Sequence, residues 1–85
     1  MEARVPVTIR LFARLREIVG TGEVVRDVPA PATVSTAWDA ITREWPALEP
    51  YRDGLSCAVN AEYAKFTDVI GEDDEVAFLP PVSGG

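Results

Sequence analysis

The chain has 85 residues, of which 47% are hydrophobic and 26% charged, and such a composition is typical of one soluble globular domain. Eight basic residues against fourteen acidic ones give a net charge of −6, which argues against nucleic acid as a partner because phosphate binding needs clustered Lys and Arg. The apolar run at residues 76–82 is too short to span a membrane and no signal peptide is visible, so a cytoplasmic location is expected.

The first third of the chain predicts two strands with a short helix between them. Apolar and polar side chains alternate over residues 5–12, the pattern of a half-buried strand. Helical spacing follows, and Gly20 stands where a left-handed C-cap would stop the helix. After a turn at residues 21–22, a second strand is predicted over residues 23–28, followed by a stiff connection at residues 29–32.

The main helix is predicted in the middle of the chain. Thr33 is a suitable N-cap, and the apolar residues that follow repeat at helical spacing up to Trp45. Pro46 disfavours helical geometry at the residue before it, so the helix should end there. Residues 46–54 are predicted to be irregular, with one short helical turn.

Short strands are predicted in the last third of the chain. Two of them, at residues 57–60 and 63–66, would flank a turn at residues 61–62. A polar turn at residues 71–74 would then lead into the last strand at residues 75–79.

This order of elements predicts an α+β fold, and the ubiquitin-like β-grasp is the expected architecture: a mixed sheet packed on one main helix, with its other face open. Residues 1–79 would form the β-grasp domain. Residues 80–85 would form a flexible C-terminal tail, because the proline pair cannot continue a sheet.

The residue types exclude several classes of enzyme. The chain has no histidine, so it lacks the usual general base at neutral pH. Cys57 is the single cysteine, so no internal disulfide can form, and no metal-ligand spacing is present. We therefore expect no catalytic side chains and no metal in this chain.

The sequence ends in Gly84 and Gly85, which leave no side chain near the terminal carboxylate. The proline pair before them stiffens the exit from the last strand. Six extended residues reach roughly 20 Å, enough to enter a narrow pocket of another protein while the folded part stays outside.

Three segments resemble the small subunits of molybdopterin synthase, a family of sulfur carriers. The most specific is residues 74–85 (DEVAFLPPVSGG). Residues 11–20 (LFARLREIVG) resemble the family's first strand-to-helix segment, and residues 58–60 (AVN) also match.

The resemblance implies that Gly85 is the reacting residue and that Gly84 provides clearance. An adenylyltransferase related to the ubiquitin-activating enzymes would use ATP to adenylate the Gly85 carboxylate, and a sulfur donor would displace AMP to leave a thiocarboxylate. That sulfur would pass to cyclic pyranopterin monophosphate in the large subunit, and two transfers would build the dithiolene of molybdopterin. No cofactor would be bound permanently. Two small subunits on a large-subunit dimer would form a heterotetramer.

An apolar patch is predicted to dock on these partners. By strand alternation Phe12 and Leu79 point away from the helix, and Tyr63 joins them. The alternative is that some of these side chains belong to the core. The predicted partner-binding residues are Phe12, Tyr63, Leu79, Pro80, Pro81, Val82 and Ser83.

Other functions fit the same residues. Sulfur carriers for thiamine or cysteine synthesis also end in Gly-Gly. A ubiquitin-like modifier would pass the same acyl-adenylate to a target lysine. A β-grasp binding module would have no terminal chemistry at all.

Overall fold

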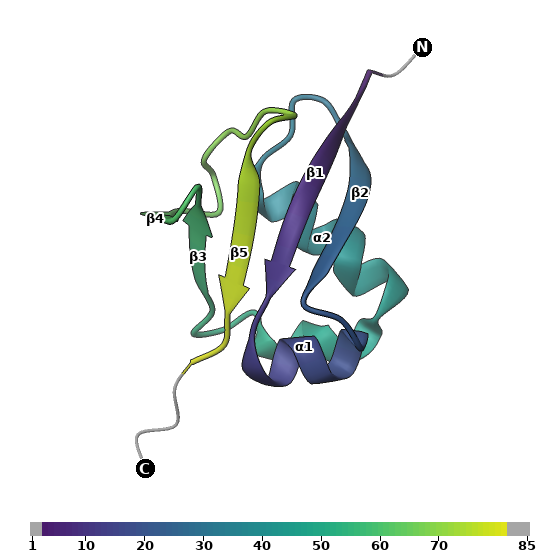
Figure 1. Cartoon of the computed structure of the whole chain (residues 1–85), viewed down its shortest axis with the longest axis vertical. Helices are drawn as coiled ribbons and strands as arrows, with labels where there is room; N and C mark the ends of the chain where they lie inside the picture. The colour runs from purple at the N-terminus through teal and green to yellow at the C-terminus, as the bar shows by residue number, and fades with distance from the viewer. Residues whose placement is uncertain (1–2, 82–85) are drawn as a thin grey trace.

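The first and last strands lie side by side in the middle of a five-stranded sheet in the computed structural model, which describes residues 3–81 (Figure 1). The strands are β1 (Arg4–Leu11), β2 (Glu23–Pro29), β3 (Ser56–Val59), β4 (Glu62–Ala64) and β5 (Glu75–Leu79), in the order β2-β1-β5-β3-β4. β1 pairs in parallel with β5, and the other neighbours are antiparallel. The sheet is therefore mixed, as predicted.

One face of this sheet is covered by helix α2 (Val34–Glu44), which Figure 1 shows behind the strands. The shorter α1 (Ala13–Val19) lies at the end of the sheet where β1 and β5 finish, and the 3-10 helix η1 (Pro46–Tyr51) follows α2. Among residues 3–81, no helix lies on the opposite face. This arrangement confirms the predicted α+β fold of the β-grasp type.

The helix ends follow the signals in the sequence. Gly20 caps α1 with a positive φ of 90°. Thr33 caps α2 through a reciprocal pair of bonds: its hydroxyl accepts from the Thr36 N–H at 3.2 Å, and the Thr36 hydroxyl accepts from the Thr33 N–H at 2.8 Å. Trp45 closes α2, and Pro46 begins η1.

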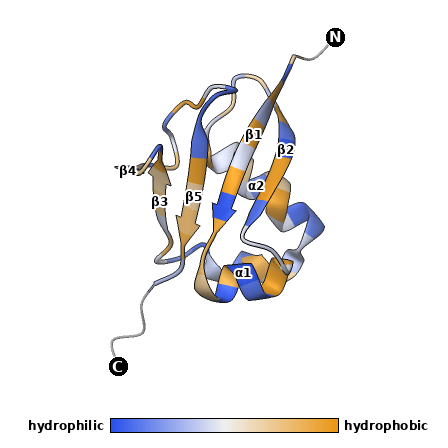
Figure 2. Ribbon diagram, viewed as in Figure 1, coloured by the Kyte–Doolittle hydropathy of each residue, from blue (hydrophilic) through white to orange (hydrophobic). Residues whose placement is uncertain are grey.

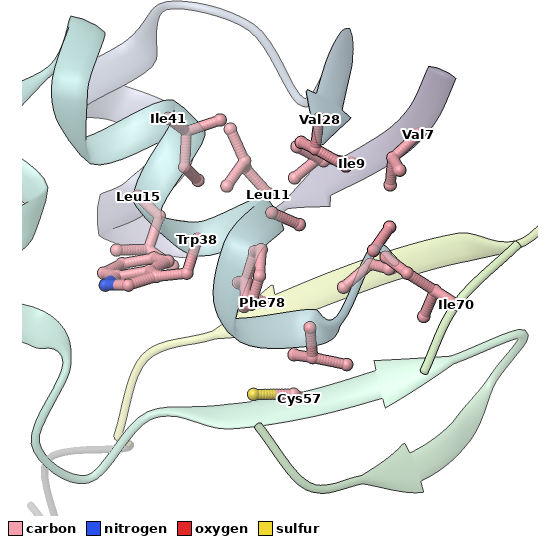
Figure 3. Close-up of a cluster of buried hydrophobic side chains, with 14 of the residues drawn as sticks. Val7, Ile9, Leu11, Leu15, Val28, Trp38, Ile41, Cys57, Ile70 and Phe78 are labelled. Carbon is pink, nitrogen blue, oxygen red and sulfur yellow. The ribbon is translucent and has the colours of Figure 1, made fainter. Parts of the chain in front are cut away.

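The core lies between α2 and the two central strands (Figure 3). Alternate residues of β1 and β5 point into it, and the Phe78 ring meets the Trp38 indole edge to face, with 5.0 Å between ring centroids and 65° between planes. The fully buried side chains of largest volume are Trp38, Phe78, Ile9, Leu11, Leu15, Ile41, Leu48, Val7, Val28, Val34 and Val76. These contacts hold β5 in place from the side of the sheet that α2 covers.

The β3–β4 hairpin differs from the prediction by one residue. Its turn lies at Asn60 and Ala61, with φ of 51° and 70°, instead of at residues 61–62. Asparagine tolerates the left-handed region, which two-residue hairpin turns require. Phe66 was predicted to lie in the return strand, but that strand ends at Ala64 and the Phe66 ring packs under the Arg52 guanidinium, 4.5 Å from the ring centroid.

Asn60 also fastens this turn to the start of β5. Its side-chain amide donates to the Asp74 carboxylate at 2.8 Å, and its side-chain oxygen accepts from the Glu75 N–H at 3.0 Å. The other Asp74 oxygen accepts from the Gly71 N–H at 2.8 Å. The Gly71 backbone bond and the Asn60 amide together hold the pKa of Asp74 below its ordinary value.

The Asp74 carboxylate should make stability depend on acid pH. Because its pKa is lowered in the folded chain, its contribution is complete above the ordinary value of 3.8 and is lost as pH falls through the folded pKa. Asp74→Asn should lower the free energy of unfolding at pH 7, and the deficit relative to the unchanged chain should shrink in this acid window. Urea unfolding at a series of pH values measures both effects.

Asp73→Asn is the matched control, because no side-chain hydrogen bond of Asp73 is found among residues 3–81. A deficit for Asp74→Asn that stayed constant from pH 7 down to the lowest pH would contradict the role given to the carboxylate.

Candidate functional site

The tail predicted to carry the chemistry starts from a fixed point at the end of β5. Leu11 of β1 and Cys57 of β3 both pair with Phe78, and Ser56 pairs with Leu79. Pairing ends after Leu79, because Pro80 has no N–H to donate. Figure 2 shows that β5 is hydrophilic where it starts and hydrophobic where it ends. The two neighbouring strands and the core together fix the point at which the tail leaves β5.

The base of the tail leans toward the loop before β3. Gly54 in that loop has a φ of 81°, and a Cβ atom placed on it would lie 3.4 Å from Cγ of Pro81. A side chain at this position would be strained by the positive φ and would press on the proline ring. Gly54 therefore lets Pro81 lie close against the folded part.

Two adjoining hollows open beside this exit, on the face of the sheet opposite α2. The first has a volume of about 520 Å³ and is lined by Phe12, Ala13, Arg14, Tyr51, Ser56, Tyr63, Leu79, Pro80 and Pro81. The second has a volume of about 280 Å³ and is lined by Phe12, Ala58, Ala61, Tyr63, Ala77 and Leu79. The three side chains of the predicted patch line both.

The structure therefore brings Phe12, Tyr63 and Leu79 together, as the alternation of the strands predicts. Phe12 is 40% exposed and Tyr63 is 88% exposed, so the alternative that they belong to the core is wrong. Leu79 is half-buried. Large apolar side chains in one exposed group are typical of an interaction surface, and docking on a partner stays a prediction.

Small residues leave the space between these side chains. Ala58 of β3 pairs with Ala77 of β5, and both line the second hollow. The sequence reasoning missed these two alanines and also Tyr51, which η1 brings to the edge of the first hollow. The signal for the alanines was available, because alternation places Ala77 on the same face as Leu79.

Charged side chains border the apolar surface and are paired within the chain. Arg10 lies 3.7 Å from Glu23 and 3.6 Å from Glu75, and so joins three neighbouring strands. Arg14 donates to Glu17 at 2.9 Å on α1. The Tyr51 hydroxyl and then the Glu17 carboxylate raise the pKa of Arg14, so its charge is permanent.

The single thiol of the chain lies in the core and does not line either hollow. Cys57 faces the core and is 4% exposed, and burial raises the pKa of its thiol, which keeps the sulfur protonated. Within residues 3–81, no group of His, Cys, Asp and Glu is placed to hold a metal ion. In the same part of the chain, no helix is long and apolar enough to cross a membrane. The predicted site residues Val82, Ser83, Gly84 and Gly85 lie outside the described residues.

Comparison with known proteins gives one family over almost the whole chain. The model of the ThiS family matches residues 9–85. The molybdopterin synthase sulfur carrier subunit of Escherichia coli is 40% identical, in a match that covers 93% of this chain and 99% of that protein. Small archaeal modifier protein 1 of Haloferax volcanii is 38% identical, covering 89% of this chain and 97% of that protein.

Solved structures show the same fold. The crystal structure of small archaeal modifier protein 1 from Haloferax volcanii has a TM-score of 0.83 at 36% identity, covering 94% of this chain and 99% of that one. The complex of subunits 1 and 2 of the molybdopterin-converting factor from Helicobacter pylori matches with a TM-score of 0.62, 21% identity, and coverage of 95% and 100%. At that identity the second match supports the fold alone.

The division between exposed patch and core can be tested by unfolding. Tyr63→Ser should change the free energy of unfolding by less than about 0.5 kcal/mol, because the ring is exposed. Phe78→Ala should cost about 3–5 kcal/mol, because it leaves a cavity beside Trp38. Urea denaturation followed by tryptophan fluorescence measures both, and a large loss for Tyr63→Ser would show that the ring belongs to the core after all.

Proposed function

Because the chain belongs to the ThiS family, we propose that it is a sulfur carrier whose reacting group is the carboxylate of Gly85. The observation that carries the proposal is the fixed exit of β5 beside an exposed apolar hollow, followed in the sequence by Pro-Pro-Val-Ser-Gly-Gly. A free carboxylate is a poor acyl electrophile. An adenylyltransferase would therefore join it to AMP with ATP, and a sulfur donor would displace AMP to give a thiocarboxylate.

The proposed user of this sulfur is molybdopterin synthase. The Escherichia coli relative carries that name at 40% identity over almost its entire length. The small subunit would deliver sulfur to cyclic pyranopterin monophosphate held by a large subunit. The large subunit would supply the acid and base groups that a chain without histidine lacks.

The apolar hollow fits the docking step of this cycle. Ordering the six tail residues in a partner's pocket costs about 1–2 kcal/mol per residue in backbone entropy. Burial of Phe12, Tyr63 and Leu79 on the partner would offset that cost, and aromatic residues are enriched among the residues that dominate binding energy. Arg10 and Arg14 beside the hollow are already paired with carboxylates of the same chain, so a partner need not neutralise their charges.

Protein modification is the second candidate. It is supported by the relative named small archaeal modifier protein 1, at 38% identity and with a TM-score of 0.83 for its structure. The chemistry shares the acyl-adenylate and differs only in the acceptor, an amine in place of sulfide. Covalent conjugates on other proteins that disappear when Gly84 and Gly85 are deleted would favour this candidate.

Intact-mass spectrometry tests sulfur transfer directly. After incubation with the cognate activating enzyme, ATP and sulfide, the chain should gain the mass difference between sulfur and oxygen. A variant lacking Gly85 should not change. An unchanged mass with an enzyme that demonstrably activates another carrier would rule out the sulfur-carrier function.

Docking through the hollow can be tested with charged substitutions. Leu79→Glu and Tyr63→Glu should each weaken binding of the large subunit by at least about tenfold, or about 1.4 kcal/mol, because a charge would be buried against apolar surface. Isothermal titration calorimetry measures the affinity, and circular dichroism checks the fold.

Val25→Glu is the matched control for these variants. Val25 is 53% exposed and lies on edge strand β2, away from both hollows. It should bind like the unchanged chain. Equal losses for Val25→Glu and Tyr63→Glu would mean that added negative charge, and not the hollow, decides binding.

A further inference from the structure

A single lysine lies at the end of the sheet from which the tail leaves. Lys65 is the only lysine in the sequence, and the other seven basic residues are arginines. It follows β4 directly and is exposed. The ion pairs found among residues 3–81 are all made by arginines, so none of them occupies the Lys65 amine.

The strand register places Lys65 level with the end of β5. Cys57 of β3 pairs with Ala64 on one side, and Ser56 pairs with Leu79 on the other. Lys65, one residue beyond Ala64, therefore lies level with Ser56 and Leu79. Two strand spacings, or about 10 Å, separate the backbones of Lys65 and Leu79.

The direction of the tail base shortens the remaining path. Pro81 lies against Gly54, which comes just before β3, so the tail starts toward the side of the sheet on which Lys65 lies. Six residues span at most about 20 Å when extended. The length of residues 80–85 is therefore sufficient for Gly85 to reach Lys65 of its own chain.

The backbone of Lys65 is held in a tight turn that leaves its amine accessible. Its N–H donates to the Asp68 carboxylate at 3.0 Å, and its carbonyl accepts from the Asp68 N–H at 3.0 Å. The amino end of the chain is the other possible amine, but β1 runs parallel to β5 and starts at the opposite end of the sheet. Arginine side chains remain protonated and do not compete as nucleophiles.

We propose that Lys65 captures the activated acyl group of Gly85 in the same chain and closes an isopeptide ring when no sulfur is supplied. This inference rests on the proposed activation of Gly85 by ATP. The Lys65 nitrogen attacks the carbonyl carbon of the acyl-adenylate, and the bond from that carbon to the AMP oxygen breaks. AMP leaves with the electron pair, and the nitrogen releases a proton to water. The ringed chain has lost one water relative to the free chain.

Capture within one chain is favoured over capture between copies. Two groups joined by a short stretch of chain that can span the gap between them meet at an effective concentration in the millimolar range, far above a micromolar protein solution. Sulfide would compete with the amine for the same carbonyl carbon. The ring is therefore the expected end product of activation without a sulfur donor, and it removes the carrier from use.

The test is incubation with the activating enzyme and ATP in the absence of sulfide, followed by intact-mass spectrometry. A monomer that has lost one water is expected. Trypsin should then leave residues 53–85 as one lariat peptide, because the modified Lys65 is no longer cleaved. Adding sulfide should replace this product by the thiocarboxylate.

Two variants locate the acceptor. Lys65→Arg keeps the charge and should abolish the ring while the acyl-adenylate and pyrophosphate still form. Adding Arg43→Lys to that variant puts an amine on α2, behind the sheet, and should give at least about tenfold less ring than the unchanged chain. Equal ring formation by the double variant, or a dimer in place of the monomer, would overturn the proposal.

The outcome also separates this inference from the proposed function. If the chain forms the thiocarboxylate with sulfide but forms no ring without sulfide, only the role of Lys65 is disproved. Absence of both products would remove both proposals. A Gly85 thioester prepared through an intein fusion provides an activated chain without the enzyme, and failure of Lys65 to capture that acyl group would also count against the ring.

Discussion

The position of β5 between β1 and β3 is the constraint on which the rest of the structure depends. Both neighbours hydrogen-bond to this strand, and Phe78 near its end is buried against Trp38. A shift by one residue would turn Phe78 to the open face and Leu79 into the core, so the register is strongly specified. The point at which Pro80 leaves the sheet is fixed as a result. The two hollows depend on the same register, because Leu79 lines both.

Recognition and chemistry are separated along the chain. The described residues supply a docking surface and a fixed exit, and they hold no histidine or metal-ligand cluster. The proposed chemistry needs only a carboxylate with nothing beside it, which two glycines provide. Cys57 illustrates the separation: the one thiol of the chain lies in the core, where burial raises its pKa and withdraws it from sulfur exchange. In the proposed function, activation and acid–base catalysis are the work of partner proteins.

The sequence predicts those parts of the site that follow from strand period and helix caps. The alternation of apolar residues in the first and last strands places Phe12 and Leu79 on the open face, because the period of two leaves no other choice once the core face is known. The position of Tyr51 could not be predicted, since it depends on how η1 packs and not on any local pattern. The hairpin turn was misplaced because Ala61 has a positive φ, which its side chain does not favour and which Asn60 beside it makes possible.

A carrier that acts as proposed would use one surface for two partners in turn. It would have to leave the activating enzyme before it docked on the protein that uses the sulfur, so very tight binding to either would stop the cycle. The hollow suits this requirement because apolar contact imposes little directional demand on the partner. Arg10 and Arg14 at its border are already paired with carboxylates of the same chain, so neither partner has to provide a fixed countercharge. In the proposed function, specificity would come from the tail, which would react only in a pocket deep and narrow enough for residues without side chains.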